Sequence, residues 1–266
     1  MLRWCSFCQK FMGESKPFDD FSWTDGICTS CKTDFENNKQ AKTADFKKRL
    51  TFFRSLRTRA IEGQSIDHHA VVTEATHLGI DAADVLIGIL QPILYEIGNL
   101  FAQNKISTIE EHRFSALTEK ILDHFENEMP IKLKSSKVQV VLASADQNYH
   151  TIGIRMLTLL LQKEGLRVRS VVPSVPAADL VKLCKEIKPN ALGISVFLDK
   201  QIEYVKEVFD ALGADRPKLI AVGGSLNKSD ALRLDSSIYT PNTRNIQDVV
   251  ERIKLACAKP AKRQAA

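Results

Sequence analysis

Four of the six cysteines form two closely spaced pairs near the N-terminus. Cys5 and Cys8 make one Cys-x-x-Cys turn, and Cys28 and Cys31 make the other, with residues 9–27 between them. Each turn can direct two thiolates at one ion, and two such turns complete a tetrahedral site. The segment has few large apolar side chains, so a bound metal would supply much of its folding free energy. The spacing therefore predicts a Zn²⁺ site, with an iron–sulfur cluster or a redox pair as alternatives.

A histidine in the second half of the chain lies where a metal could be bound from a sheet edge. His150 belongs to the sequence Asn-Tyr-His-Thr-Ile-Gly at residues 148–153, after the apolar run 138–143. Open α/β sheets bind their ligands outside the carboxyl ends of their strands. We therefore expect the His150 imidazole at such an edge, where Gly153 lets a bulky ring approach the following helix.

The pattern around this histidine alternates regularly between strand-like and helix-like runs. Buried strands are predicted at 138–143, 168–172, 191–197 and 219–222, with a weaker fifth at 237–239. Helices are predicted at 151–163, 176–187, 200–212, 227–233 and 245–258. Such alternation is typical of an α/β domain with a flavodoxin-like, Rossmann-type parallel sheet, here over residues 136–258.

Two more loops of the predicted sheet edge carry small or polar residues. Ser195 ends the third strand, and Gly223 and Gly224 end the fourth. A Gly-Gly pair after a strand is often only a turn, so neither loop indicates a site by itself. Because parallel strands end at one edge, we expect both loops to line the same site as His150.

The middle of the chain has helical periodicity. Residues 39–128 contain apolar positions at helical spacing, and the sequence from Ser107 to Glu110 is a capping box that opens the last of four predicted helices. Pro92 lies inside the third and should kink it. The short connections predict an antiparallel four-helix bundle. The predicted organisation is a zinc-ribbon-like module (1–38), the bundle (39–128), the α/β domain (136–258) and a disordered basic tail (259–266).

Three sequence features together resemble cobalamin-binding proteins. The loop from His150 to Gly153 resembles the cobalt-ligating loop of cobalamin-binding domains, in which the histidine replaces the cofactor's own base. Phe101, followed ten residues later by Glu111 and His112, resembles the helical module that covers the upper cobalamin face in light-responsive transcription regulators. In that family a Trp stands at the Phe101 position. An adjacent Glu-His pair is otherwise common on helices and often has no ligand role.

The resemblance implies a cofactor, adenosyl- or methylcobalamin, and assigns residues to it. His150 would ligate the cobalt from below, and Asn148 stands where the family has an acid that holds the imidazole. The remaining implied residues are Ser195, Gly223 and Gly224 along the cofactor tail, with Phe101, Glu111 and His112 around the upper ligand.

Three functions are compatible with such a protein, and none makes the chain itself an enzyme. The first is a sensor or regulator, with a photoreceptor as one form of it, that acts through the cysteine module on a signalling or transcription-regulator protein. The second is a corrinoid carrier that passes methyl groups between methyltransferases, and the third is a cobalamin store. The sequence leaves association into an oligomer open.

The charge distribution bears on a nucleic-acid partner. The formal net charge is +5, and the stretch from Lys32 to Arg59 holds nine Lys or Arg against three Asp or Glu. A basic helix over 39–59 could contact DNA directly, or it could be only a solvated helix face. We expect no apolar run to reach the roughly 20 residues that cross a bilayer, and the N-terminus lacks a signal-peptide core. We therefore predict a cytoplasmic protein with no membrane partner.

Overall fold

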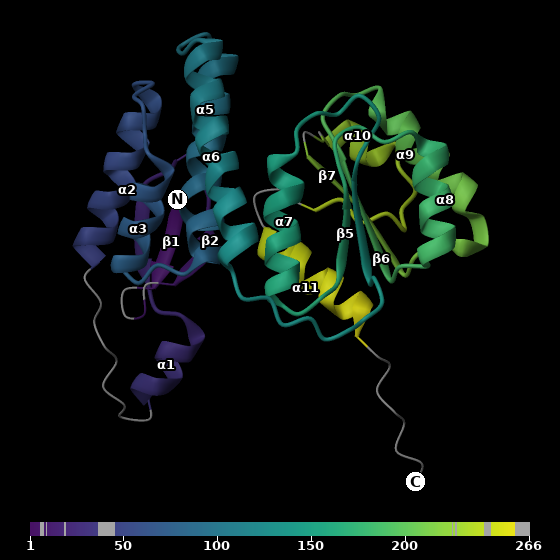
Figure 1. Ribbon diagram of the computed structural model, residues 1–266, viewed down its shortest axis with the longest axis horizontal. Coiled ribbons are helices and arrows are strands. Elements are labelled where there is room, and N and C mark those ends of the chain that lie inside the picture. Colours follow the sequence, from purple (N-terminus) through teal and green to yellow (C-terminus); the bar gives the residue numbers. More distant parts are fainter. Residues whose placement is uncertain are drawn as a thin grey trace. The chain divides into compact units, whose positions relative to one another are not determined.

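The computed structural model describes residues 1–5, 8, 10–18, 20–36, 46–224, 226, 228–241 and 246–258. The chain divides into two compact units, Met1–Met129 and Pro130–Ala266, called here the N-terminal and the C-terminal unit (Figure 1). The predicted tail at 259–266 and the start of the predicted basic helix, residues 39–45, lie outside the described residues.

The C-terminal unit is built on a parallel sheet, as the sequence predicted. Its strands, in the order β5-β4-β6-β7, are β5 (Val168–Val171), β4 (Val140–Ser144), β6 (Ala191–Val196) and β7 (Leu219–Gly224). One face is covered by α7 (Ile152–Lys163) and α11 (Ile246–Cys257), and the other by α8 (Ala177–Ile187) and α9 (Gln201–Leu212) (Figure 1). The 3-10 turn η2 (Gly213–Asp215) and the short helix α10 (Lys228–Leu232) complete the unit.

The prediction of a fifth strand at 237–239 is wrong, because this segment forms only a single parallel bridge, between Ala221 and Tyr239. The Tyr239 N–H donates to the Ile220 carbonyl at 2.9 Å. The preceding residues are instead held in a turn, since the Asp235 carboxylate accepts hydrogen bonds from the backbone and the hydroxyl of Ser237. This turn leaves too few extended residues for a strand.

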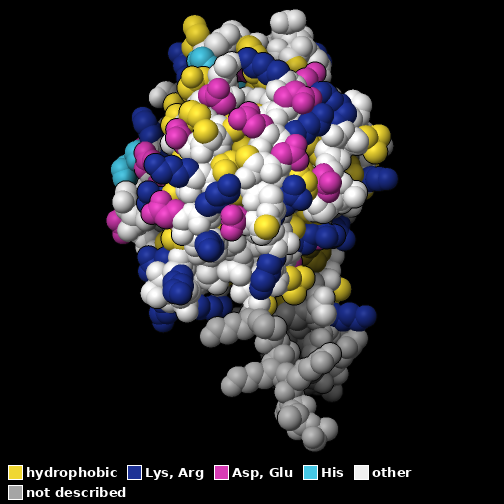
Figure 2. Space-filling view, turned by 90° about the vertical axis from the view of Figure 1, so that its right-hand side faces the viewer, with side chains coloured by type: hydrophobic (Ala, Val, Ile, Leu, Met, Phe, Trp, Pro, Cys, Tyr) yellow, Lys and Arg dark blue, Asp and Glu magenta, His cyan; other side chains and the backbone are white. Residues whose placement is uncertain are grey.

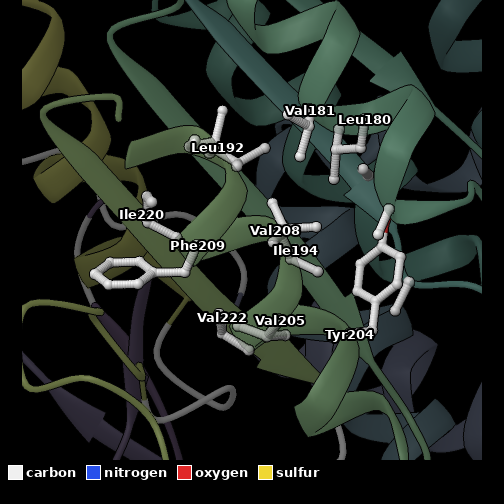
Figure 3. Close-up of a cluster of buried hydrophobic side chains, with 14 of the residues drawn as sticks. Leu180, Val181, Leu192, Ile194, Tyr204, Val205, Val208, Phe209, Ile220 and Val222 are labelled. Carbon is white, nitrogen blue, oxygen red and sulfur yellow. The ribbon is translucent and has the colours of Figure 1, made fainter. Parts of the chain in front are cut away.

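Alternate side chains of β4 point to opposite faces of the sheet, and one face forms the main apolar core of this unit. Val141 and Ala143 of β4 face α8 and α9, where they join the cluster that contains Ile194 and Val208 (Figure 3). Each such buried aliphatic side chain stabilises the fold by roughly 1.5–3 kcal/mol. Because strand residues alternate between faces, Ser144 points to the opposite layer, under α7 and α11.

The N-terminal unit contains the predicted bundle of four helical segments. Its helices are α2 (Phe46–Ile61), α3 (His68–His77), α4 (Ala82–Val85), α5 (Gln91–Ala102) and α6 (Thr108–Glu128), with the π-helical turn η1 (Leu86–Leu90) joining α4 to α5. Phe53, Ile93 and Ile121 are among its buried core residues. The predicted capping box is present, and its Glu110 carboxylate accepts a hydrogen bond from the Ser107 N–H at 2.5 Å.

The irregularity predicted near Pro92 takes the form of the π-helical turn. The Gln91 N–H donates to the Leu86 carbonyl, five residues earlier, just before Pro92 enters α5. With this turn, Ala82–Ala102 forms a helical stretch long and apolar enough to cross a membrane by length and composition alone. The expectation that no segment reaches this length is therefore wrong. More than half of the most apolar window is buried inside the protein, so core packing accounts for its composition.

A small sheet carries the cysteines. Its strands, in the order β2-β1-β3, are β1 (Leu2–Cys5), β2 (Phe11–Glu14) and β3 (Trp23–Gly26), and the helix α1 (Thr29–Glu36) follows. β1 is antiparallel to β2 and parallel to β3. We call β1–β3 with α1 the cysteine module. It belongs to the same compact unit as the bundle, and β2 contacts η1.

Candidate functional site

The loop that bears His150 is fixed to the end of the neighbouring strand by a buried amide. Asn148 is only 1% exposed, and its Nδ2 donates to the backbone carbonyl of Ser195 at 2.9 Å and to the Ser195 Oγ at 3.2 Å. Its Oδ1 accepts a hydrogen bond from the His150 backbone N–H at 3.0 Å. Asn148 thus joins the ends of β4 and β6 and sets the path of the chain into His150.

The imidazole of His150 is exposed and rests on an aromatic ring. Its centroid lies 3.9 Å from that of Phe197. Asn148, implied by the resemblance to hold the imidazole, bonds the backbone of His150 and not its ring. Asp146 is also directed elsewhere, because its Oδ1 accepts from the Ser174 hydroxyl and the Gln147 N–H. The contact with Phe197 therefore orients the imidazole.

Gln201, which the sequence analysis missed, supports the same edge. This residue is 2% exposed, and its Oε1 accepts from the backbone N–H groups of Phe197 at 2.6 Å and Leu198 at 3.0 Å. Its Nε2 donates to the Asp146 carbonyl at 2.8 Å. One buried side chain thus links the loops after β4 and β6. A glutamine at a helix start carries no sequence signal of this role.

The edge presents apolar side chains to solvent. Tyr149 is 70% exposed, Phe197 46% and Leu198 40%, and all three flank His150 in the two loops. Clustered exposed apolar groups are uncommon outside binding surfaces. The edge is therefore suited to a large, partly apolar ligand.

The glycines implied at this edge have different structural settings. A Cβ on Gly153 would meet no atom within 4 Å, so the first turn of α7 is open on that side. Gly224 has φ +112°, and a Cβ there would lie 2.0 Å from the Val196 carbonyl oxygen. The sheet itself therefore requires glycine at 224. Gly223 pairs with Ser195 in the register of β6 and β7.

The residues expected over the upper cofactor face lie at one end of the bundle. Phe101 is 42% exposed near the end of α5, and it lines a depression of about 440 Å³ together with the loop before α6 and Glu110. Glu111 accepts a hydrogen bond from the Ser115 hydroxyl at 2.8 Å. The His112 side chain is 72% exposed, with its Nε2 3.5 Å from the Glu111 carboxylate. These helices thus leave His112 free to meet a ligand.

The four paired cysteines converge. Their sulfur atoms all lie within 4.8 Å of one another, and the Sγ atoms of Cys8 and Cys28 are 3.6 Å apart. Tetrahedral Zn–S bonds of 2.3 Å would place neighbouring sulfurs about 3.8 Å apart. The Cys28 N–H points at the Cys5 sulfur at 3.4 Å, and the Cys31 N–H at the Cys28 sulfur at 3.5 Å. Backbone donors therefore surround a sulfur cage of the size that a metal ion needs.

Two of these thiols, Cys8 and Cys31, have a raised pKa, which favours their protonated form unless a cation is bound. Burial raises the pKa of the Cys8 thiol, and it raises the pKa of Cys31 together with hydrogen bonds among the neighbouring thiols. A divalent cation would displace the protons and stabilise the thiolates. Cys184 lies apart from the cage in the core of the C-terminal unit, where burial raises its pKa to about 11.

Three cations of the predicted basic helix form hydrogen bonds within the bundle. Arg49 is buried and donates to the Leu78 and Gly79 carbonyls, and Arg59 donates to the Ser65 carbonyl. Arg57 forms a bidentate pair with Glu96, which raises the pKa of Arg57.

The charges left at the surface are mixed. Lys47 and Arg54 remain among the exposed cations of α2. In the C-terminal unit, the face that bears α8 and α9 shows Lys and Arg interspersed with Asp and Glu (Figure 2). The described surface of α2 is thus less basic than its sequence indicated.

Each of the two units contains a segment that matches a known protein family. A family model described as a B12 binding domain matches residues 138–238, and a second B12 binding domain model matches residues 53–126. Both segments are B12 binding domains. The predicted resemblance to cobalamin-binding proteins is confirmed, and both matches support binding of cobalamin, or vitamin B12, by this protein.

The relatives fall into two groups. Dimethylamine corrinoid protein 2 of Methanosarcina mazei is 25% identical over 155 residues, which cover 56% of this chain and 70% of the relative. The HTH-type transcriptional repressor CarA of Myxococcus xanthus is 26% identical over 166 residues, 62% of this chain and 54% of the repressor. A solved cobalamin-binding protein from Desulfitobacterium hafniense aligns with a TM-score of 0.42 at 18% identity, over 76% of this chain and 98% of its own. The curated relatives are carriers and regulators, which agrees with the prediction that the chain is not itself an enzyme.

The C-terminal B12 binding domain contains polar atoms that suit a cofactor. The hydroxyls of Ser144, Thr158 and Ser170 are buried and have no hydrogen-bond partner among the described residues. Ser170 and Ser144 face the layer under α7, on which Thr158 lies, because their strand neighbours face the opposite core. Buried hydroxyls without partners cost about 1–3 kcal/mol each. A ligand with polar groups entering this layer would satisfy them, so the residues present fit cobalamin.

Proposed function

We propose that this protein is a cobalamin-dependent sensor in which His150 supplies the lower ligand of the cobalt. The observation that carries the proposal is the exposed imidazole at the end of β4, set by Asn148 and Phe197 beside an open helix start at Gly153. A neutral imidazole is a good ligand for cobalt, and its donor nitrogen must be accessible. The exposed side chain of His150 supports this role.

The other residues of this edge would hold the rest of the cofactor. Ser195 and Gly223 would line its tail, and the unsatisfied hydroxyls under α7 would receive its polar groups. Gly224 would contribute bare backbone, although the sheet already requires glycine there. Bound cobalamin supplies a cobalt–carbon bond that light or a nucleophile can break.

The sensor is favoured by the side chains at the end of the bundle. Phe101, Glu111 and His112 would surround the upper ligand, and the nearby Glu111 carboxylate, 3.5 Å away, orients the His112 imidazole. A carrier must leave the upper face accessible to methyltransferases, so it gains nothing from such a pair. Transcriptional repressors among the relatives support the same choice. Light sensing through adenosylcobalamin, with Phe101 packed on the adenosyl group, is the specific form that we propose.

The alternative is a corrinoid methyl carrier. Dimethylamine corrinoid protein 2 of Methanosarcina mazei is covered over 70% of its length, against 54% for the repressor CarA. This coverage reflects the two-domain plan that carriers share with this chain. A carrier would bind methylcobalamin and exchange its methyl group with a partner enzyme, without a response to light.

The cysteine module would hold Zn²⁺ and transmit the signal. Its sulfur spacing fits tetrahedral zinc, and Cys8 and Ile27 are exposed on the module. We propose that this surface binds a signalling or transcription-regulator protein. Direct contact with DNA would use exposed cations of α2 such as Lys47 and Arg54.

Visible spectra of the full chain test the proposal. The protein is mixed with adenosylcobalamin or methylcobalamin, and spectra are recorded before and after green light for the native chain and for His150→Ala. His77→Ala, an exposed histidine of α3, is the matched control. Ligation by His150 predicts a bound spectrum in which the cofactor's own base is displaced, lost in His150→Ala and kept in His77→Ala.

The light response separates the two functions. A rapid spectral change of the adenosyl form, with a change in oligomer size, supports the sensor. A complex that is insensitive to green light and accepts methyl groups from a methyltransferase supports the carrier. Equal spectra for His150→Ala and the native chain would refute the assignment of His150 in both cases.

A further inference from the structure

The cysteine module is joined to the bundle by an aromatic cluster next to a metal ligand. Trp4 directly precedes Cys5 in β1 and is fully buried. Its ring stacks on Trp23, with centroids 4.5 Å apart and an interplanar angle of 17°, and lies 5.2 Å from Phe11. Trp23 in turn lies 5.2 Å from Phe53 of α2. The stacked rings of Trp4 and Trp23 therefore pack the module against the bundle.

The cluster is seated on the π-helical turn. A Cβ on Gly88, in the middle of η1, would lie 2.6 Å from the Trp4 ring and 2.9 Å from Phe11. Such distances do not occur between real side chains, so glycine at 88 is what allows the indole to reach the helix backbone. π-Helical turns are rare and are often found at functional positions.

The π-helical turn continues directly into the helix that bears the upper-face residue Phe101. α5 begins at Gln91, immediately after η1, and Phe101 lies near its other end. Between them Glu96 is paired with Arg57 of α2. The helix is thus fixed at two places, by the Trp4 contact at its start and by the ion pair in its middle.

The cysteine module is too small to keep this arrangement without metal. Each strand of its sheet is four residues long, and its large buried side chains are mostly those that contact the bundle. Sheets of this size are marginal alone, and small metal-binding modules generally unfold when the ion is removed. Loss of the metal would therefore withdraw Trp4 from Gly88.

We propose that Trp4 and Gly88 are positioning residues through which the metal in the four-cysteine site controls the cobalamin-binding helix α5. This inference rests on the proposed metal site. Under this proposal, metal binding to the cysteine module raises the affinity for cobalamin, so that cobalamin binds the metal-loaded protein more tightly than the metal-free one. By linkage, cobalamin also raises the affinity of the cysteines for their metal.

The first test uses hydrogen exchange of the full chain without cobalamin. Bound metal is measured first, and exchange is then compared for the metal-loaded protein, the chelator-treated protein and Cys8→Ser. Cys257→Ser, outside the sulfur cage, is the control. We expect faster exchange in residues 86–102 as well as in residues 1–5 and 10–36, with no change in the strands of the C-terminal unit.

The second test breaks the contact and leaves the cysteines intact. Gly88→Ala should speed exchange in α5 and lower cobalamin affinity by roughly tenfold, a typical coupling between linked sites. The double variant Gly88→Ala with Trp4→Phe removes most of the clash between the added methyl group and the ring at position 4. It should restore part of the cobalamin affinity. This smaller ring loses no hydrogen bond, because the Trp4 indole N–H has no partner among the described residues. Gly98→Ala, with no atom within 4 Å, is the control for exchange in α5.

The outcomes separate this inference from the proposed function. A purified chain that holds no metal would overturn the metal site and the control by metal with it. Bound metal, with exchange in 86–102 and cobalamin affinity unchanged after its removal and in Gly88→Ala, would overturn the inference alone. Faster exchange in residues 86–102 with weaker cobalamin binding, both after metal removal and in Gly88→Ala, would support the inference.

Discussion

The two B12 binding domains present their candidate ligands in opposite ways. In the C-terminal unit, His150 lies on a loop that is held by the buried amides of Asn148 and Gln201, which are 1% and 2% exposed. In the N-terminal unit, His112 projects from a regular helix with 72% of its side chain in solvent. The loop of His150 is held by buried hydrogen bonds, whereas the His112 side chain extends into solvent. This difference suits a cofactor with a fixed lower ligand and a changeable upper one.

The largest effect is expected at Gly224, where the sheet rather than the cofactor sets the residue. Gly224→Ala forces a side chain onto backbone at φ +112° and against the Val196 carbonyl oxygen. We expect the free energy of unfolding of the C-terminal unit to fall by about 3 kcal/mol, because the added side chain causes backbone strain and overpacking. Urea denaturation without cobalamin measures this change. A stable variant that has lost only cobalamin affinity would show that Gly224 serves the cofactor alone.

A smaller loss of stability is expected when the hydrogen bonds that hold the His150 loop are removed. Asn148→Ala removes the bonds to Ser195 and leaves the His150 N–H unpaired. The free energy of unfolding should fall by about 2 kcal/mol, the usual cost of an unsatisfied buried group. Calorimetry measures the stability, and titration should show weaker cobalamin binding. The control is Asn127→Ala, on the exposed face of α6. Unchanged affinity in Asn148→Ala would contradict preorganisation of His150.

Gly153 should separate stability from binding. Gly153→Ala places a methyl group in open space within the first turn of α7 and favours helix by up to about 1 kcal/mol. We expect a slightly higher melting temperature without cofactor and a several-fold lower cobalamin affinity, because the corrin ring needs the space. If the affinity is kept, the ring does not approach this helix.

The smallest change in stability is expected at the exposed upper residues. His112→Ala removes a side chain with no buried contact, so the melting temperature of the free protein should stay constant. The rate of the light-driven spectral change with adenosylcobalamin should alter, and Glu111→Gln should act in the same direction. Identical rates in all three proteins would remove the main reason for preferring the sensor to the carrier.

The sequence predicted the elements well because their signals are local. Apolar runs with β-branched residues marked the four strands of the parallel sheet, and the capping box at Ser107 marked the start of α6. Two Cys-x-x-Cys turns were enough to predict a sulfur cage. In each case the residues that decide the structure are neighbours in the chain.

The missed features depend on contacts between distant residues. Gly88 is a weak helix former in isolation, and only its contact with Trp4, far away in the chain, explains it. The role of Gln201 depends on a carbonyl at Asp146. The pattern at 237–239 predicts a strand because it does not reveal the turn formed by Asp235. Site residues that act through tertiary hydrogen bonds were therefore beyond the reach of pattern and spacing.

The assignment of His150 is tested most directly by electron paramagnetic resonance of the protein with cob(II)alamin. The chain is prepared with ordinary histidine and with ¹⁵N-labelled histidine, while the cofactor keeps ¹⁴N. If His150 ligates the cobalt, the splitting from the lower nitrogen changes from a triplet to a doublet on labelling, and this change is absent in His150→Ala. A triplet that persists with labelled histidine would show that the cofactor's own base remains bound, and would contradict the account.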